Sequence, residues 1–119
     1  AKTVEPTPNL PGTIFTVADE LEALGVEALP FQLDLRDANQ AAACVEAAIS
    51  KWGRVDVLVN NASALWWQDI PDTPLKKYDL ITGINTRGAF AMTAACLPHM
   101  ERGGFGRVIT MSPPIVTNP

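Results

Sequence analysis

Residues 55–63 constrain the fold of this chain more than any other segment. The run Val-Asp-Val-Leu-Val at 55–59 is almost continuously apolar, which is typical of a parallel strand covered on both faces. Ligands of open α/β sheets bind beyond the carboxyl ends of the strands. We therefore predict that the residues directly after the strand face a ligand: Asn60, Asn61, Ala62 and Ser63. The alternative is a loop in which asparagine only accommodates a turn.

Composition limits the class of protein further. With 119 residues, 47% of them hydrophobic, the chain can form one domain with a packed core. A net charge of -4 argues against nucleic acid or an anionic membrane surface as the partner. No apolar run approaches the roughly 18 residues of a membrane span. Two cysteines in helical patterns indicate reduced thiols in a cytoplasmic protein, and a single histidine argues against a metal site.

Hydrophobic periodicity predicts an alternation of helices and strands. Thr13 can cap a helix that ends at Gly25, Asp37 can cap one that ends at Gly53, and Thr73-Pro74 opens a third, longer helix. Asp37 and Gln40 have the spacing of a capping box. Strands are predicted at 28–33, 55–59 and 107–111, which places the chain in the α/β class with a doubly wound parallel sheet.

Asn85 lies in the long predicted helix, close to its apolar face. Gly83 and Gly88 flank it and weaken the helix by about 1 kcal/mol each, so close packing or a local kink must compensate. Taken alone, Asn85 is more typical of a buried amide that bonds to the backbone than of a catalytic group.

Several of these motifs resemble one family. The sequence Val-Asn-Asn-Ala-Ser at 59–63 resembles the Asn-Asn-Ala-Gly signature of the short-chain dehydrogenases/reductases, and 84–88 and 107–112 resemble two further segments of that family. Within the family the chain most resembles the hydroxysteroid dehydrogenase-like 2 group. The resemblance implies a Rossmann-like sheet of order 3-2-1-4-5. It predicts that residues 1–119 are one partial domain, which lacks the first strands and the C-terminal part.

The resemblance also implies roles for individual residues. Asp34 and Leu35 correspond to the pair that contacts adenine, although Asp34 could instead begin the next turn. Asn85 corresponds to the catalytic Asn, whose helix irregularity holds a water of the proton relay. Ser112 corresponds to the substrate-facing serine, but relatives often carry a second serine where this chain has Pro113-Pro114.

The cofactor prediction rests on Lys2. In the resemblance it stands at the end of the second strand, where an acidic residue would bind the 2′-hydroxyl of NAD. Lysine favours the 2′-phosphate of NADP(H) instead, unless it is simply a solvated terminal residue.

Two expected motifs are absent. The sequence has no glycine-rich nucleotide fingerprint after a strand, and Tyr78 is followed four residues later by Thr82, so no Tyr-x-x-x-Lys is present. We therefore expect an internal segment that is inactive by itself, with strands 28–33 and 55–59 not adjacent.

The leading hypothesis is a segment of an NADP(H)-dependent oxidoreductase that interconverts an alcohol and a carbonyl on an apolar substrate. Leu65, Trp66 and Trp67 could line its substrate pocket, or could pack against the core or another subunit. The alternative is a non-catalytic lipid-handling or nucleotide-binding Rossmann module. A homo-oligomer is what the resemblance implies for the full-length protein.

Overall fold

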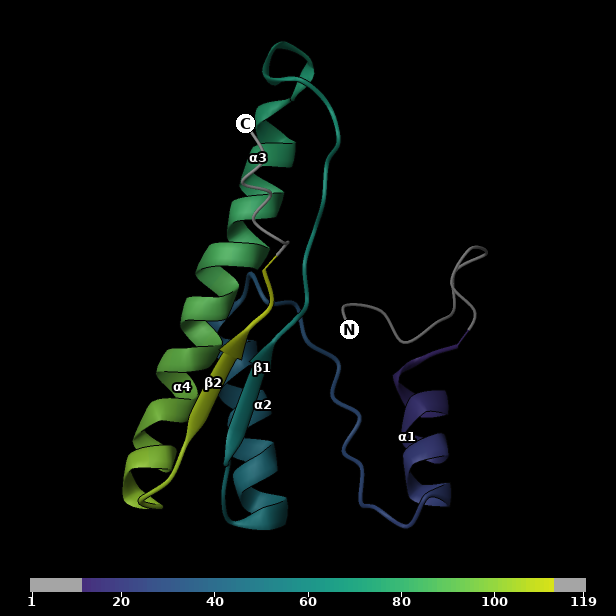
Figure 1. Ribbon diagram of the computed structural model, residues 1–119, viewed down its shortest axis with the longest axis vertical. Helices are drawn as coiled ribbons and strands as arrows, with labels where there is room; N and C mark the ends of the chain where they lie inside the picture. Colours follow the sequence, from purple (N-terminus) through teal and green to yellow (C-terminus); the bar gives the residue numbers. More distant parts are fainter. Residues whose placement is uncertain (1–11, 113–119) are drawn as a thin grey trace, which may run out of the picture.

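The computed structural model describes residues 12–112 and orders the elements as an alternation of helices and strands (Figure 1). The elements are, in order, α1 (Ile14–Ala23), α2 (Ala38–Trp52), β1 (Val57–Asn60), the 3₁₀-helix η1 (Ile70–Asp72), α3 (Leu75–Thr82), the π-helix η2 (Gly83–Gly88), α4 (Ala89–Arg102) and β2 (Arg107–Thr110). Helices α3, η2 and α4 follow one another without a break, as one long column in Figure 1. This confirms the predicted long helix and its irregularity.

The two strands pair in parallel, as predicted for this class of fold. Val57 lies opposite Arg107, and the register continues to Asn60 opposite Thr110. Because both strands run in the same direction, their carboxyl ends reach the same edge of the sheet. The polar segments after the two strands therefore begin side by side.

The core forms where α2 and α4 pack together behind β1. Val45 of α2 meets Cys96 and Met100 of α4, and all three side chains are buried. Leu58 of β1 packs against this cluster. The turn into β2 also depends on it, because a Cβ at Gly106 would lie 2.6 Å from both the Cβ and the Sδ of Met100. Glycine is thus required there by close packing.

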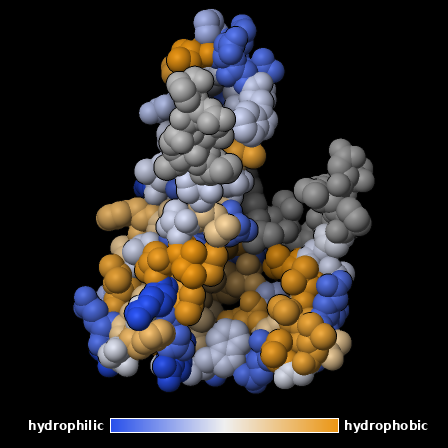
Figure 2. All heavy atoms as spheres, in the orientation of Figure 1, coloured by the Kyte–Doolittle hydropathy of each residue, from blue (hydrophilic) through white to orange (hydrophobic). Residues whose placement is uncertain are grey.

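The prediction that β1 is covered on both faces is wrong for the described part of the chain. Val57 and Val59 are 50% and 51% exposed, whereas Leu58 between them points toward α2 and α4. Figure 2 shows apolar residues gathered on the open face over the strands and again over α1. An unbroken run of apolar residues cannot show which of the two faces a neighbouring element covers.

The predicted strand at 28–33 is also not formed within residues 12–112. The segment is extended, but a strand requires a hydrogen-bonded neighbour, and the sheet in this part of the chain contains β1 and β2 alone. It is held instead by the end of α2, where Lys51 Nζ donates to the Ala28 carbonyl at 2.7 Å. Trp52 Nε1 likewise donates to Glu27 Oε2 at 2.6 Å. The prediction that this segment and β1 are not neighbours is confirmed.

Helix α1 begins at the predicted cap, but its apolar side chains are largely exposed. Thr13 accepts hydrogen bonds from the amides of Phe15 and Thr16, and the Thr16 hydroxyl accepts one from the Thr13 amide. Figure 1 shows α1 standing apart from the other helices. Phe15 and Val17 are consequently 49% and 53% exposed. In residues 12–112, no helix is both long and apolar enough to cross a membrane.

The buried thiols give a testable pH dependence. Burial raises the pKa of Cys96 above its ordinary value, with a smaller contribution from a Cys44 thiolate, and burial also raises the pKa of Cys44. A raised pKa keeps both thiols protonated to higher pH, so alkylation by iodoacetamide should rise at higher pH in the folded protein than in urea. Measuring the rate against pH in both solvents checks this, and identical profiles would contradict it.

Candidate functional site

A cavity of about 700 Å³ opens at the carboxyl ends of β1 and β2. It brings together all the predicted site residues that the structure describes. These are Asp34, Leu35, Asn60, Asn61, Ala62, Ser63, Asn85 and Ser112. Lys2 lies outside the described residues, so the structure does not bear on it. Residues up to 78 positions apart in the sequence thus share one cleft at the edge where ligands of parallel sheets bind.

Asn60, the last residue of β1, ties the strand end to α4. Its Nδ2 donates to Thr93 Oγ1 at 3.3 Å, and the Thr93 hydroxyl donates to the Ala89 carbonyl at 2.8 Å. The Asn60 carbonyl accepts from the Met111 amide at 3.1 Å, which continues the ladder with the second strand. Asn60 therefore holds the rim of the cleft in place on two sides.

Asn85 holds the loop that comes after this strand. Its Oδ1 accepts from the Ala64 amide at 2.9 Å, and its Nδ2 donates to the Ala64 carbonyl at 3.0 Å. Asn85 sits in the middle of the π-helix η2, a kind of helical irregularity that is often found at functional sites. The expected bonding to backbone is confirmed, but the expected burial is wrong, because the side chain sits at the open cleft and is exposed.

Asp34 also lines the cavity, where it is held by two neighbours that sequence reasoning did not predict. Arg36 donates from Nε to Oδ1 at 2.9 Å and from Nη2 to Oδ2 at 2.6 Å. This hydrogen bonding, with the charge of Asp34, raises the pKa of the Arg36 guanidinium. The Asp34 amide donates to Gln40 Oε1 at 2.9 Å. The spacing of Asp34 and Arg36, two residues apart and of opposite charge, was the sequence signal that could have predicted this ion pair.

The Gln40 contact corrects the predicted capping box. Asp37 does cap α2, accepting from the amides of Asn39 and Gln40 at 2.9 and 3.4 Å. Gln40 does not close the box by accepting from the Asp37 amide. Its side-chain oxygen accepts from Asp34 instead, because the extended segment before α2 brings that amide within reach.

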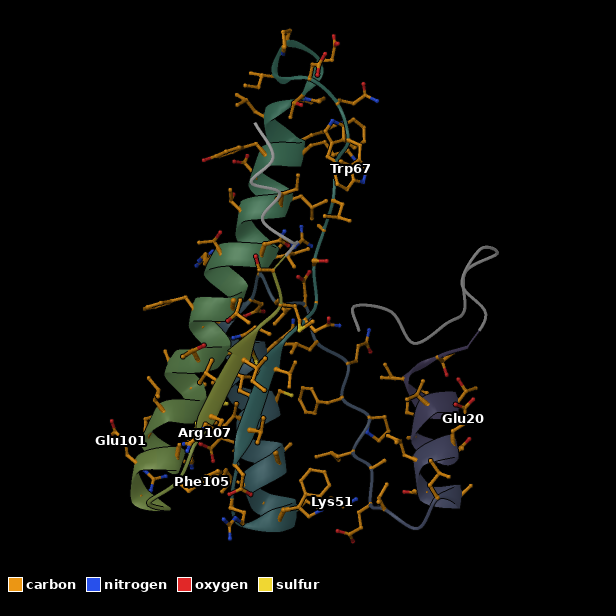
Figure 3. All side chains as sticks on the ribbon, in the orientation of Figure 1. Glu20, Lys51, Trp67, Glu101, Phe105 and Arg107 are labelled. Atoms are coloured by element: carbon orange, nitrogen blue, oxygen red, sulfur yellow. The ribbon has the colours of Figure 1, made fainter. Side chains whose placement is uncertain are left out.

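The two tryptophans of the loop after β1 have different surroundings. The Lys77 ammonium lies 4.3 Å from the centroid of the Trp66 ring, so Trp66 packs against α3. Trp67 and Leu65 line the cavity, and Trp67 remains 83% exposed at its mouth (Figure 3). The structure thus distinguishes an anchoring ring from one that is available to a ligand.

His99 lies away from the cavity, on α4. Its Nε2 is 3.2 Å from Glu46 Oε1, and its Nδ1 is 2.7 Å from Arg102 Nη2. Its side chain is 13% exposed, and it links α4 to α2. Among residues 12–112, no group of His, Cys, Asp and Glu side chains is arranged to hold a metal ion.

Comparison with known proteins agrees with this geometry. The family model described as short chain dehydrogenase matches residues 10–118. The chain belongs to the short-chain dehydrogenase family. The hydroxysteroid dehydrogenase-like protein 2 of Xenopus tropicalis is 47% identical over all 119 residues, and the chain spans 28% of the length of that relative.

Solved structures of the short-chain dehydrogenase family have the same fold. A short chain dehydrogenase from Mycobacterium thermoresistibile matches the whole chain with a TM-score of 0.92 and 44% identity, and the match covers 42% of that protein. A metagenomic short-chain oxidoreductase in complex with NADP matches with a TM-score of 0.85 and 28% identity, over 100% of this chain and 51% of its own. The partial Rossmann-like sheet is therefore confirmed, as is the resemblance to the hydroxysteroid dehydrogenase-like group.

The Asn85 amide gives a prediction for the cleft. Asn85→Ala removes both bonds to Ala64, whereas Asn85→Asp keeps an acceptor for the Ala64 amide. One such bond is worth about 1 kcal/mol, so hydrogen exchange at the Ala64 amide should speed up roughly fivefold in the alanine variant. In the aspartate variant it should stay closer to the original rate. Equal exchange in all three proteins, measured by NMR, would contradict this role of Asn85.

Proposed function

We propose that residues 1–119 form the cofactor-facing half of the cleft of an NADP(H)-dependent oxidoreductase, which interconverts an alcohol and a carbonyl group on an apolar substrate. The observation that carries the proposal is the shared cavity, which joins Asp34 and Leu35 to the rim at Asn60–Ser63 and to Asn85. These three groups come from different parts of the chain, so their convergence is a property of the fold.

The residues present fit a dinucleotide. The Asp34 carboxylate lines the cavity and is held there by the amide, Nε and Nη2 of Arg36, and the family resemblance assigns the adenine contact to this residue. Leu35 supplies an apolar contact beside it. Small residues at Ala62 and Ser63 let a ligand approach the backbone of the rim. A nicotinamide bound there would supply or accept the hydride.

In this proposal the residues near the reacting carbon assist the proton transfer and do not carry it out. Asn85 organises the proton path from the π-helix, and Ser112 polarises the carbonyl from just beyond the end of β2. The sole tyrosine of the chain, Tyr78, is 59% exposed on α3 and has no lysine four residues later. The proton-transferring pair would thus be supplied by other parts of the intact protein.

The substrate side of the cleft supports an apolar ligand. Apolar side chains form much of the cavity lining, among them Leu65, Trp67, Ile84, Met92 and Met111. We further propose a homo-oligomer in the cytoplasm. The family resemblance supports the oligomer, as do apolar residues on the long helix such as Phe90 and Leu97, which are 74% and 43% exposed.

The cofactor preference rests on Lys2, with the NADP complex of one structural neighbour as support. The intact protein should bind NADPH at least tenfold more tightly than NADH, since a lost charged pair costs about 1.4 kcal/mol or more. Lys2→Glu should weaken NADPH and strengthen NADH, because an acidic residue at this position repels the 2′-phosphate and can bind the 2′-hydroxyl. Fluorescence titrations with both cofactors measure this, and equal affinities in the unchanged protein would remove the argument from Lys2.

Activity separates the oxidoreductase from the non-catalytic alternative, which is favoured by Pro113-Pro114 and by the absence of Tyr-x-x-x-Lys in this chain. The intact protein should oxidise NADPH in the presence of apolar ketones, and Trp67→Ala should raise KM for them by about tenfold with little change in kcat. Trp66→Ala is the matched control. Nucleotide binding without oxidation of NADPH by apolar ketones, and without reduction of NADP+ by the corresponding alcohols, would support the non-catalytic module.

A further inference from the structure

The π-helix η2 begins and ends on glycines, and the same dipeptide packs on both. A Cβ built on Gly83 would lie 3.4 Å from Cγ of Arg36. A Cβ built on Gly88 would lie 2.9 Å from Cβ of Leu35 and 3.0 Å from its carbonyl oxygen. Leu35 and Arg36 come directly after Asp34, so the segment that carries the cofactor-side carboxylate rests on the helix turn that carries Asn85.

Neither glycine is needed for its backbone conformation. Gly83 has φ -61° and Gly88 has φ -64°, values that any residue adopts in a helix. Gly88 is buried, and the lack of room for a side chain is what requires glycine there. Alanine at either position would otherwise favour the helix.

The neighbours of the two glycines differ in how far they can move. The atoms nearest Gly83 belong to the flexible stem of Arg36, and ordinary van der Waals contact begins at their distance. The atoms nearest Gly88 are the Cβ and the backbone carbonyl oxygen of Leu35. A methyl group at Gly88 would therefore displace the peptide that joins Leu35 to Arg36.

That displacement would reach Asp34, whose position depends on the same segment. Its carboxylate is held by Arg36, and its amide is held by Gln40 of α2. Asn85 is anchored separately, through its two bonds to Ala64. A change at Gly88 therefore acts on the Asp34 side of the cleft, while the anchor of Asn85 stays intact.

We infer that Gly88 is a positioning residue, whose missing side chain seats Leu35 on the π-helix and so sets the distance between the adenine side of the cleft and Asn85. The inference rests on the proposed function, because it assumes a dinucleotide that extends across this cleft. A change at Gly88 should therefore weaken binding of the adenosine half of the cofactor and leave binding of the nicotinamide half unchanged.

The test uses the intact protein with Gly88→Ala and, as the matched control, Gly83→Ala. Adenosine monophosphate and nicotinamide mononucleotide are titrated separately by calorimetry, after circular dichroism has shown that each variant is folded. Gly88→Ala should weaken adenosine monophosphate by about tenfold or more and leave nicotinamide mononucleotide within about twofold. Gly83→Ala should leave both ligands within about twofold, because the added methyl group would meet the Arg36 stem at ordinary contact distance and Arg36 could keep its bonds to Asp34.

The other outcomes overturn the inference. Unchanged binding of adenosine monophosphate by Gly88→Ala would show that Leu35 adjusts without moving Asp34. Equal weakening of both ligands would indicate general damage to the fold. If the unchanged protein binds neither half nor the whole cofactor, the proposed function fails, and the inference fails with it. If only the inference is wrong, the unchanged protein still binds the cofactor, so the two failures can be told apart.

A measurement on the unchanged protein covers the case in which Gly88→Ala does not fold. Adenosine monophosphate should slow hydrogen exchange at the amides of Leu35 and of Gly83–Gly88, since the bound ligand would steady the segment that rests on this turn. The amides near the start of α1, remote from the cavity, serve as the internal control. Slowed exchange at Leu35 with none at the π-helix would contradict the coupling.

Discussion

Two hydrogen bonds between the Asn85 side chain and the Ala64 backbone determine the shape of the site. They fix the point at which the chain leaves β1 and runs out over the long helix. A regular α-helix repeats every 3.6 residues, whereas a π-turn is wider and rotates the helix after it relative to the helix before it. The wider turn at Gly83–Gly88 therefore lets one continuous column serve both the cleft and the packing against β1 and α2. If the amide were absent, the loop that carries Leu65 and Trp67 would lose its attachment beside the cavity.

The cleft is built by side chains that first satisfy one another. Asp34 is held by Arg36 and Gln40, and Asn60 is held by Thr93. Such contacts leave polar groups in fixed positions without a ligand, which reduces the cost of ordering them when one binds. The buried core of Val45, Cys96 and Met100 lies away from this edge and supplies the rigid support behind it.

The sequence predicted well the features that depend on local spacing. Thr13, Asp37 and Gly53 were identified as helix ends because capping depends on residues only a few positions apart. The end of β1 and its polar residues were predicted by similar local patterns, whereas the grouping of Asp34, Asn85 and Ser112 with them followed from the family resemblance. Contacts made across the fold were not predictable in this way. The segment at 28–33 is not a strand because strand pairing depends on a remote partner, and the open face of β1 depends on the elements that lie over it. Arg36 and Gln40 bond to Asp34 because of the path that the extended segment takes, and hydrophobic periodicity does not predict that path.

The most direct test of this account is to locate the cofactor on the intact protein. An amide NMR titration with NADPH should shift the resonances of Asp34, Leu35 and the rim at Asn60–Ser63, with those of α1 unchanged. A crystal structure of the complex would show the adenine at Asp34 and the nicotinamide near Asn85. Saturable binding of NADPH that leaves the rim and Asp34 unperturbed would contradict the central claim that these residues form the wall of a nucleotide cleft.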